Sequence, residues 1–155
     1  MKGDAEVVDL LNELLTFELT AINQYYIHYK MCRNWGYERT ASRFKDEAMD
    51  EMKHADAMIE RILFFEGIPN MQRLNPVKVG ENVPEQLKLA LATELEARDL
   101  LNRGVALCRD RGDNGTRDML EEMVRAEEEA IDWLEAQLGI IEEIGRERYL
   151  AEMIH

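Results

Sequence analysis

Apolar residues recur at every third or fourth position along four long stretches of the chain, which is the period of an amphipathic α-helix. The stretches predict helices over residues 5–34, 37–65, 84–111 and 116–144. Asp4 is the expected N-cap of the first helix, and Gly145 is expected to end the fourth. Residues 146–154 are then expected to form a short fifth helix. The pattern therefore predicts an all-α protein.

The segments between these stretches are short, long and short. Trp35-Gly36 and residues 111–115 are typical of tight turns. Residues 66–83 have no helical period, and they make a connection far longer than the about 2–8 residues usual between bundled helices. Two antiparallel hairpins joined by one long crossover make a four-helix bundle. Because no linker or low-complexity segment interrupts this pattern, residues 1–155 are predicted to form a single domain.

Composition and charge narrow the range of partners. The chain of 155 residues is long enough to bury a core, and its 46% hydrophobic content argues against disorder. Its 19 Lys and Arg residues and 32 Asp and Glu residues give a net charge of −13. Such a surface repels phosphate backbones, so we expect no nucleic-acid partner. It suits metal cations, although an excess of acid also keeps many proteins in solution.

The sequence has no pattern typical of export, membrane insertion or disulfide formation. No apolar segment follows Met1–Glu6, so we expect no signal peptide, and no run approaches the about 20 residues of a membrane span. Cys32 and Cys108 form no CxxC pair, which fits reduced thiols. We therefore expect a cytoplasmic protein without a membrane partner.

An acid interrupts each inward-facing apolar stripe near the middle of its helix. The four acids are Glu18, Glu51, Glu94 and Glu127. Mid-helix positions of an antiparallel bundle lie at the same height, and each buried ionised carboxylate costs several kcal/mol there. One such Glu alone would fit the edge of a stripe, in contact with solvent. Four together indicate that protons or a pair of metal cations compensate the charge, and they predict a metal site.

His54 follows Glu51 by three residues and therefore shares its helix face. Ferritin-like di-iron bundles use one Glu from each of two helices and a Glu-x-x-His motif from each of the other two. Residues 127–130 read Glu-Glu-Glu-Ala, so Ala130 stands where a second imidazole would belong. The two residues between them turn away from the core face and are not expected to replace it. Ala130 is either a natural feature that leaves one metal position weakly held or a substitution introduced to disable the site.

Five longer motifs are spread over the whole chain. They are Met1–Asp4, Glu18–Tyr26, Asp50–Asp56, Arg61–Asn70 and Ile131–Glu135. In these motifs the chain resembles the bacterioferritins, the haem-containing branch of the ferritin superfamily. The resemblance implies a hollow shell of 24 subunits, of one kind or of two, that oxidises Fe(II) with O2 or H2O2 and stores Fe(III) mineral. It also implies a ferredoxin-like reductant as a partner.

Six residues resemble ligands of the metals that the family binds. By position, the iron ligands of the di-iron centre correspond to Glu18, Glu51, His54, Glu94 and Glu127, and the axial ligand of haem b corresponds to Met52. The resemblance implies that Glu51 and Glu127 bridge the two irons and that two subunits each supply one Met52. Because Met52 directly follows Glu51, its side chain should point away from the metal-binding face, and a thioether suits haem iron.

Several residues near these positions have two interpretations. Tyr25 either bonds to a ligand carboxylate or only packs, and Trp133 is either an electron donor or a structural residue. Asp50 either orients the nearby imidazole or lines the inner cavity of the shell. His28 and His155 are expected at the surface.

Two functions remain open on the sequence alone. One is a ferroxidase whose di-iron centre is weakened by Ala130, coupled to mineral storage. The other is a non-catalytic, haem-binding shell subunit that relies on a partner subunit for ferroxidase activity. The four interior acids favour the first, and Ala130 favours the second.

Overall fold

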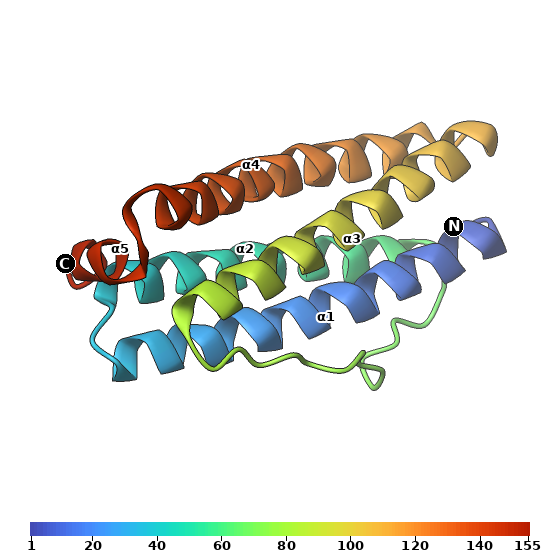
Figure 1. The fold of residues 1–155 in the computed structure, drawn as a ribbon. Helices are drawn as coiled ribbons and strands as arrows, with labels where there is room; N and C mark the ends of the chain where they lie inside the picture. The colour runs from blue at the N-terminus through green and yellow to red at the C-terminus, as the bar shows by residue number, and fades with distance from the viewer.

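Four long helices lie side by side as a bundle in the computed structural model, which describes residues 1–155 (Figure 1). The helices are α1 (Ala5–Asn34), α2 (Glu38–Phe64), α3 (Val83–Asp110), α4 (Asn114–Ile144) and the short α5 (Arg146–Glu152). The chain termini lie at opposite ends of the bundle, and α5 sits at the C-terminal end (Figure 1). The predicted all-α bundle with a fifth short helix is confirmed, and each boundary agrees to within two residues.

Side-chain caps explain where the helices begin. The Asp4 carboxylate accepts hydrogen bonds from two main-chain amides in the first turn of α1, at 2.9 and 3.2 Å. Asn82 caps α3 in the same way, 2.9 Å from the amide of Glu85. Asp113 caps α4, so Asn114 and the glycine after it belong to the helix rather than to the preceding turn, where we expected them.

The long crossover runs along α1 from the end of α2 to the start of α3 (Figure 1). Three α1 side chains spaced eight residues apart hold its main chain. Asn12 bonds to residues 68 and 70, the Thr20 hydroxyl accepts from the amide of residue 75, and His28 Nε2 accepts from the amide of Gly80 at 2.9 Å. His28 is therefore fully buried, and the expectation that it lies at the surface is wrong.

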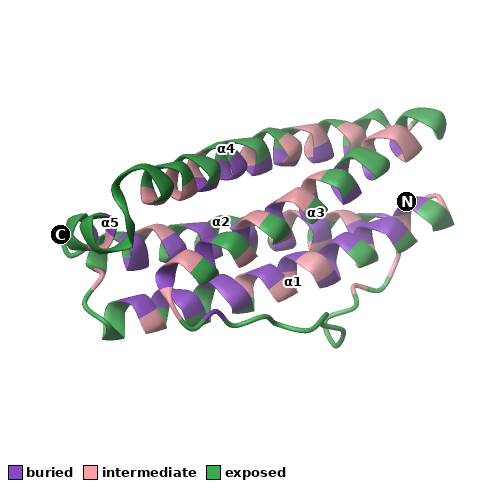
Figure 2. Ribbon diagram, viewed as in Figure 1, coloured by how far each residue is buried: buried purple, intermediate pink, exposed green.

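The apolar core consists of two clusters. One is centred on residues such as Leu11 and Leu101, and the other on residues such as Tyr25 and Phe44. In every long helix a buried glutamate falls between the residues that belong to one cluster and those that belong to the other. Buried positions accordingly line the facing sides of the helices (Figure 2), and a polar layer crosses the bundle near its middle.

None of the helices combines the length and the apolar character that crossing a membrane requires.

Candidate metal centre

Each long helix contributes one carboxylate to the polar layer. Glu18, Glu94 and Glu127 are each 1% exposed, and Glu51 is 3% exposed. Glu18, Glu51, His54 and Glu127 each offer one donor atom, and these atoms lie within 4.8 Å of one another. Glu94 is not in this group; it forms a second such group with Glu51 and Glu47. The structure thus brings together all five residues expected at a metal centre.

The His54 imidazole faces three of the carboxylates. Its Nδ1 lies 3.6 Å from Glu51 Oε2, 3.6 Å from Glu127 Oε1 and 3.9 Å from Glu18 Oε2. These distances exceed those of ordinary hydrogen bonds. The imidazole nitrogen and the oxygens therefore surround a common space without being joined to one another.

Buried polar atoms without a partner are concentrated in this layer. Seven buried side-chain nitrogen or oxygen atoms in the protein make no hydrogen bond, and five of them belong to the layer. The five are Glu18 Oε2, His54 Nδ1, Glu94 Oε2 and both carboxylate oxygens of Glu127. Leaving such atoms unpaired in a core costs free energy. Carboxylate and imidazole donors suit divalent iron and similar cations, so the residues present fit a metal site.

The surroundings of the layer raise the pKa of two of its groups. Burial alone would lower the pKa of His54, but the neighbouring carboxylates of Glu127 and Glu51 outweigh it and raise the pKa to about 10. Burial, followed by the charge of Glu51, raises the pKa of Glu127 to about 8 despite the nearby imidazole. A bound cation would displace the protons of these two groups.

Tyr25 bonds to one of the expected ligands. Its hydroxyl donates to Glu94 Oε1 at 2.5 Å, and both side chains are buried. Burial raises the pKa of Tyr25 well above its ordinary value, so the hydroxyl keeps its proton. Of the two interpretations of Tyr25, the structure therefore supports the bond to a carboxylate, and that bond leaves Glu94 Oε2 free.

The polar layer, called the carboxylate layer from here on, consists of Glu18, Glu51, His54, Glu94 and Glu127. A hollow of about 280 Å³ lies beside Ala130 and reaches this layer. Ala130 is 5% exposed, and Glu51, His54 and Glu127 line the same space. Glu129 lines its rim and is exposed, as expected for a residue turned away from the core. The short side chain at position 130 leaves this space unfilled by protein.

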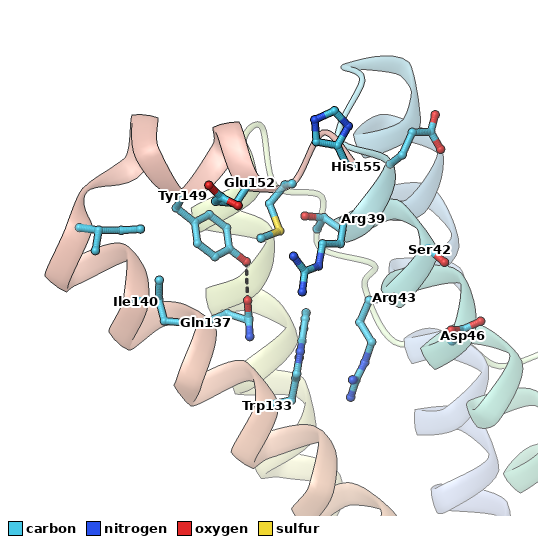
Figure 3. A pocket seen from close by; sticks show the side chains of 14 residues that line it. Arg39, Ser42, Arg43, Asp46, Trp133, Gln137, Ile140, Tyr149, Glu152 and His155 are labelled. Carbon is cyan, nitrogen blue, oxygen red and sulfur yellow. Dashed lines mark hydrogen bonds between the residues drawn. The ribbon is translucent and has the colours of Figure 1, made fainter.

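Asp50 pairs with Lys53 and makes no ion pair with His54, and Trp133 packs against Arg43. Asp50 lines the hollow, and its carboxylate lies 3.5 Å from Lys53 Nζ rather than against the imidazole. The Trp133 ring lies under the Arg43 guanidinium, whose carbon is 4.3 Å from the ring centroid (Figure 3). Trp133 also lines a larger cavity of about 650 Å³ toward α5, where Tyr149 donates to Gln137 (Figure 3). This contact supports the structural interpretation of Trp133, and its role as an electron donor stays a prediction.

Glu47 is a further candidate metal donor that was not expected from the sequence. It lies one turn before Glu51 on α2, is 8% exposed, and shares the second donor group with Glu51 and Glu94. The signal was present in the sequence, because residues four apart lie on the same helix face.

Met52 lies outside the carboxylate layer. It is 47% exposed on the outer side of α2, as expected for the residue after Glu51, and Met49 one turn earlier is 48% exposed. Two half-exposed methionines make an apolar, thioether-bearing patch on this surface. A ligand bound there would be reached from outside the bundle.

Comparison with known proteins finds a family model and full-length relatives that match this chain. A family model for the ferritin-like domain matches residues 8–144. A bacterioferritin of Mycobacterium leprae is 46% identical over 154 residues, which covers 99% of this chain and 97% of the relative. A bacterioferritin of Streptomyces coelicolor is 44% identical over 154 residues, covering 99% and 92%. One of Brucella melitensis is 42% identical over 149 residues, covering 96% and 92%.

Proposed function

This chain belongs to the bacterioferritins, and from that premise we propose that each subunit oxidises Fe(II) at a two-metal centre and passes Fe(III) to a stored mineral. Iron storage is the general function of the family. The observation that carries the ferroxidase proposal is the convergence of five unpaired, buried donor atoms from all four long helices. Cations bound among these carboxylates would compensate their charge more fully than the protons of the layer do.

The proposed ligands of the two metals are Glu18, Glu51, His54, Glu94 and Glu127. Glu51 belongs to both donor groups, which suits a carboxylate that bridges two cations. Glu127, with both oxygens free, is the proposed second bridge. Tyr25 holds the Glu94 carboxylate in place through its hydrogen bond.

Iron is the substrate of the proposed reaction. Two Fe(II) ions each lose one electron. With H2O2 as oxidant, the two electrons and two protons yield two water molecules, and with O2 they yield H2O2. The protein contributes by holding both ions together and by offering carboxylates, which stabilise the more highly charged Fe(III) product.

Ala130 weakens the centre in this proposal. The position near His54 keeps an imidazole, whereas the position near Glu94 has carboxylates only. A cation there loses a nitrogen ligand and is held more loosely. We therefore propose an asymmetric centre whose second position empties easily.

We also propose that Met52 would hold haem b through its sulfur, together with a second Met52 from a neighbouring subunit. Its exposed thioether fits a group shared between subunits. Haem would supply one-electron transfer between the stored mineral and a ferredoxin-like reductant. A Met52→Leu variant is expected to purify without the haem absorption band, whereas Met49→Leu, one turn away, should retain it.

The remaining proposals concern assembly and location. Residues 1–155 act as one ferritin-like domain, and the domains assemble into a 24-subunit shell of one or two chain types. The shell resides in the cytoplasm and binds neither nucleic acid nor membrane. A net charge of −13 per subunit is consistent with a mineral store that attracts cations.

A second candidate function is a non-catalytic shell subunit that depends on a partner subunit for oxidation. Ala130 is the observation that favours it, because the residue removes an expected metal ligand. In that case the carboxylate layer would bind iron in transit without oxidising it.

The initial rate of aerobic Fe(II) oxidation separates these functions. We expect the wild type to exceed Glu127→Gln by at least about 10-fold, and Glu128→Gln to match the wild type because Glu128 is exposed. Ala130→His should be faster than the wild type. A wild-type rate equal to that of Glu127→Gln would contradict the ferroxidase proposal. Equal rates for wild type and Ala130→His would show that position 130 is not part of the working centre.

A further inference from the structure

We infer that Glu47 supplies the donor that completes the second metal position, in place of the imidazole that position 130 lacks. The inference rests on the proposed function, because it names a further ligand of the same centre. It adds a residue outside the expected ligand set.

The position of Glu47 on α2 provides the geometry. It precedes Glu51 by one helical turn, so both carboxylates project from the same face. Glu47, Glu51 and Glu94 each offer an oxygen, and these oxygens lie within 4.8 Å of one another. The Glu47 side chain is only 11% exposed.

An unsatisfied buried acceptor points to a ligand at this group. Glu94 is 1% exposed, and its Oε1 accepts from Tyr25, but its Oε2 has no partner. Three carboxylates around such an atom repel one another, and no donor of the protein bonds to it. A cation between Glu47, Glu51 and Glu94 would satisfy the acceptor and relieve the repulsion.

Arg43 holds Glu47 in the orientation that this role requires. Its Nε and Nη2 lie 2.9 and 2.8 Å from the same oxygen, Glu47 Oε1. The other carboxylate oxygen of Glu47 makes no hydrogen bond and is available to a cation. The guanidinium is itself fixed over the Trp133 ring, and Figure 3 shows the two side chains next to each other. The contact of Arg43 with Trp133 thus positions a carboxylate of the centre.

Glu47 and residue 130 border the same space from two different helices. Both line the hollow of about 280 Å³, Glu47 from α2 and Ala130 from α4. A larger side chain at 130 would project into this hollow, whereas alanine leaves it to the carboxylate. The donor changes from nitrogen to oxygen, so the second position becomes an all-oxygen site that suits hard cations.

Binding of Co(II) to the assembled, metal-free protein under anaerobic conditions tests the inference without any turnover. Stoichiometry is measured by calorimetry and by the visible absorption of bound Co(II). We expect two Co(II) per subunit for the wild type, the second held more weakly than the first, and one for Glu47→Gln, whose amide oxygen can still accept from Arg43. Glu129→Gln is the matched control, because Glu129 lines the same hollow but belongs to neither donor group, and it should bind two.

Rescue distinguishes a lost ligand from general damage. Ala130→His added to Glu47→Gln should restore binding of two Co(II), since the imidazole would return to the second position. Two Co(II) bound by Glu47→Gln alone would overturn the inference. One Co(II) bound by both wild type and Glu47→Gln would also overturn it, and would mean that the Arg43 charge takes the place of the second cation. No Co(II) bound by the wild type would instead refute the proposed centre itself.

Discussion

Two buried polar regions of this bundle are built in opposite ways. The crossover anchor consists of His28, Gly80, Gln86 and Cys32. His28 Nε2 accepts from the Gly80 amide at 2.9 Å, the Gln86 amide donates to the Gly80 carbonyl at 3.1 Å, and Cys32 Sγ lies 3.0 Å from Gln86 Oε1. The carboxylate layer has no such internal bonding among its acids.

The two regions differ in the number of their unpaired atoms and in the pKa of their histidines. One atom of the crossover anchor, His28 Nδ1, lacks a partner, against five atoms in the carboxylate layer. Burial lowers the pKa of His28 to about 4, whereas carboxylates raise the pKa of His54 to about 10 against the effect of burial. Hydrogen bonds within the chain hold the anchor together and leave one atom unpaired, whereas the unpaired atoms of the carboxylate layer gain partners only when a ligand binds. Burial of a polar residue alone does not distinguish structure from function.

We expect the largest effect on the function of the carboxylate layer from Glu51→Gln. Glu51 belongs to both donor groups, so its loss is expected to slow Fe(II) oxidation by at least about 100-fold. The metal-free protein should keep or raise its thermal midpoint, because one of several mutually repelling carboxylates is removed. Oxidation rates and calorimetry of chelator-treated protein check both expectations. A midpoint lowered by more than about 4 °C would assign Glu51 a structural role instead.

His28→Phe should destabilise the crossover anchor without changing metal binding by the carboxylate layer. The replacement keeps an aromatic ring but leaves the buried Gly80 amide unpaired, which is expected to lower the free energy of unfolding by about 1–3 kcal/mol. Co(II) stoichiometry should not change. Urea unfolding beside the exposed control His155→Phe measures the difference. Reduced metal binding in His28→Phe would show that the two regions are coupled.

The same variant tests the acid response of the anchor. Because the pKa of His28 is lowered from 6.5 to about 4 in the folded protein, its contribution to stability is present above pH 6.5 and is lost as the pH falls toward 4. Protonation would also remove the lone pair that accepts from Gly80. We expect His28→Phe to be less sensitive to pH over this window than the His155→Phe control.

The layer should respond to pH in the opposite direction. His54 and Glu127 bind protons more tightly when folded, so the metal-free protein loses stability as the pH rises from 6.5 toward 10 at His54 and from 4.5 toward 8 at Glu127. Co(II) replaces these protons, so its stabilising effect should grow with pH, by about 1.4 kcal/mol per pH unit for each proton displaced. The gap between the thermal midpoints with and without Co(II), measured at pH 6, 7 and 8, reports this stabilising effect. A constant gap would mean that no proton leaves on binding.

The fold and the four central acids of the carboxylate layer were predictable because both follow from patterns among residues that are close in sequence. The helices follow from a regular apolar period and caps such as Asp4. The four central acids stand out because each replaces an apolar residue in a stripe. Glu47 was missed because it lies in an acidic stretch with Asp46 and Asp50 and resembles a solvated position. Its burial depends on Arg43 and on the distant Trp133.

His28 was misplaced for a related reason. Its partner Gly80 is 52 residues away in a segment without helical period, so nothing local to His28 indicates that it is covered. Contacts made by the crossover arise from the way it lies along α1. A side chain whose environment is set by such long-range packing cannot be assigned from its own neighbours in sequence.

Tyr25→Phe tests where the two regions meet and should have the smallest effect. The Tyr25 ring packs against Phe44, which also contacts His28, while the Tyr25 hydroxyl bonds to Glu94 in the layer. Phenylalanine keeps the packing and removes only the hydrogen bond, so we expect stability to change by no more than about 1 kcal/mol. Fe(II) oxidation should slow by about 10-fold or less, with two Co(II) still bound, because the hydroxyl orients a ligand and is not one. Loss of one Co(II) would show that Glu94 holds its cation only when Tyr25 fixes it, and the layer would then depend on its neighbours as the anchor does.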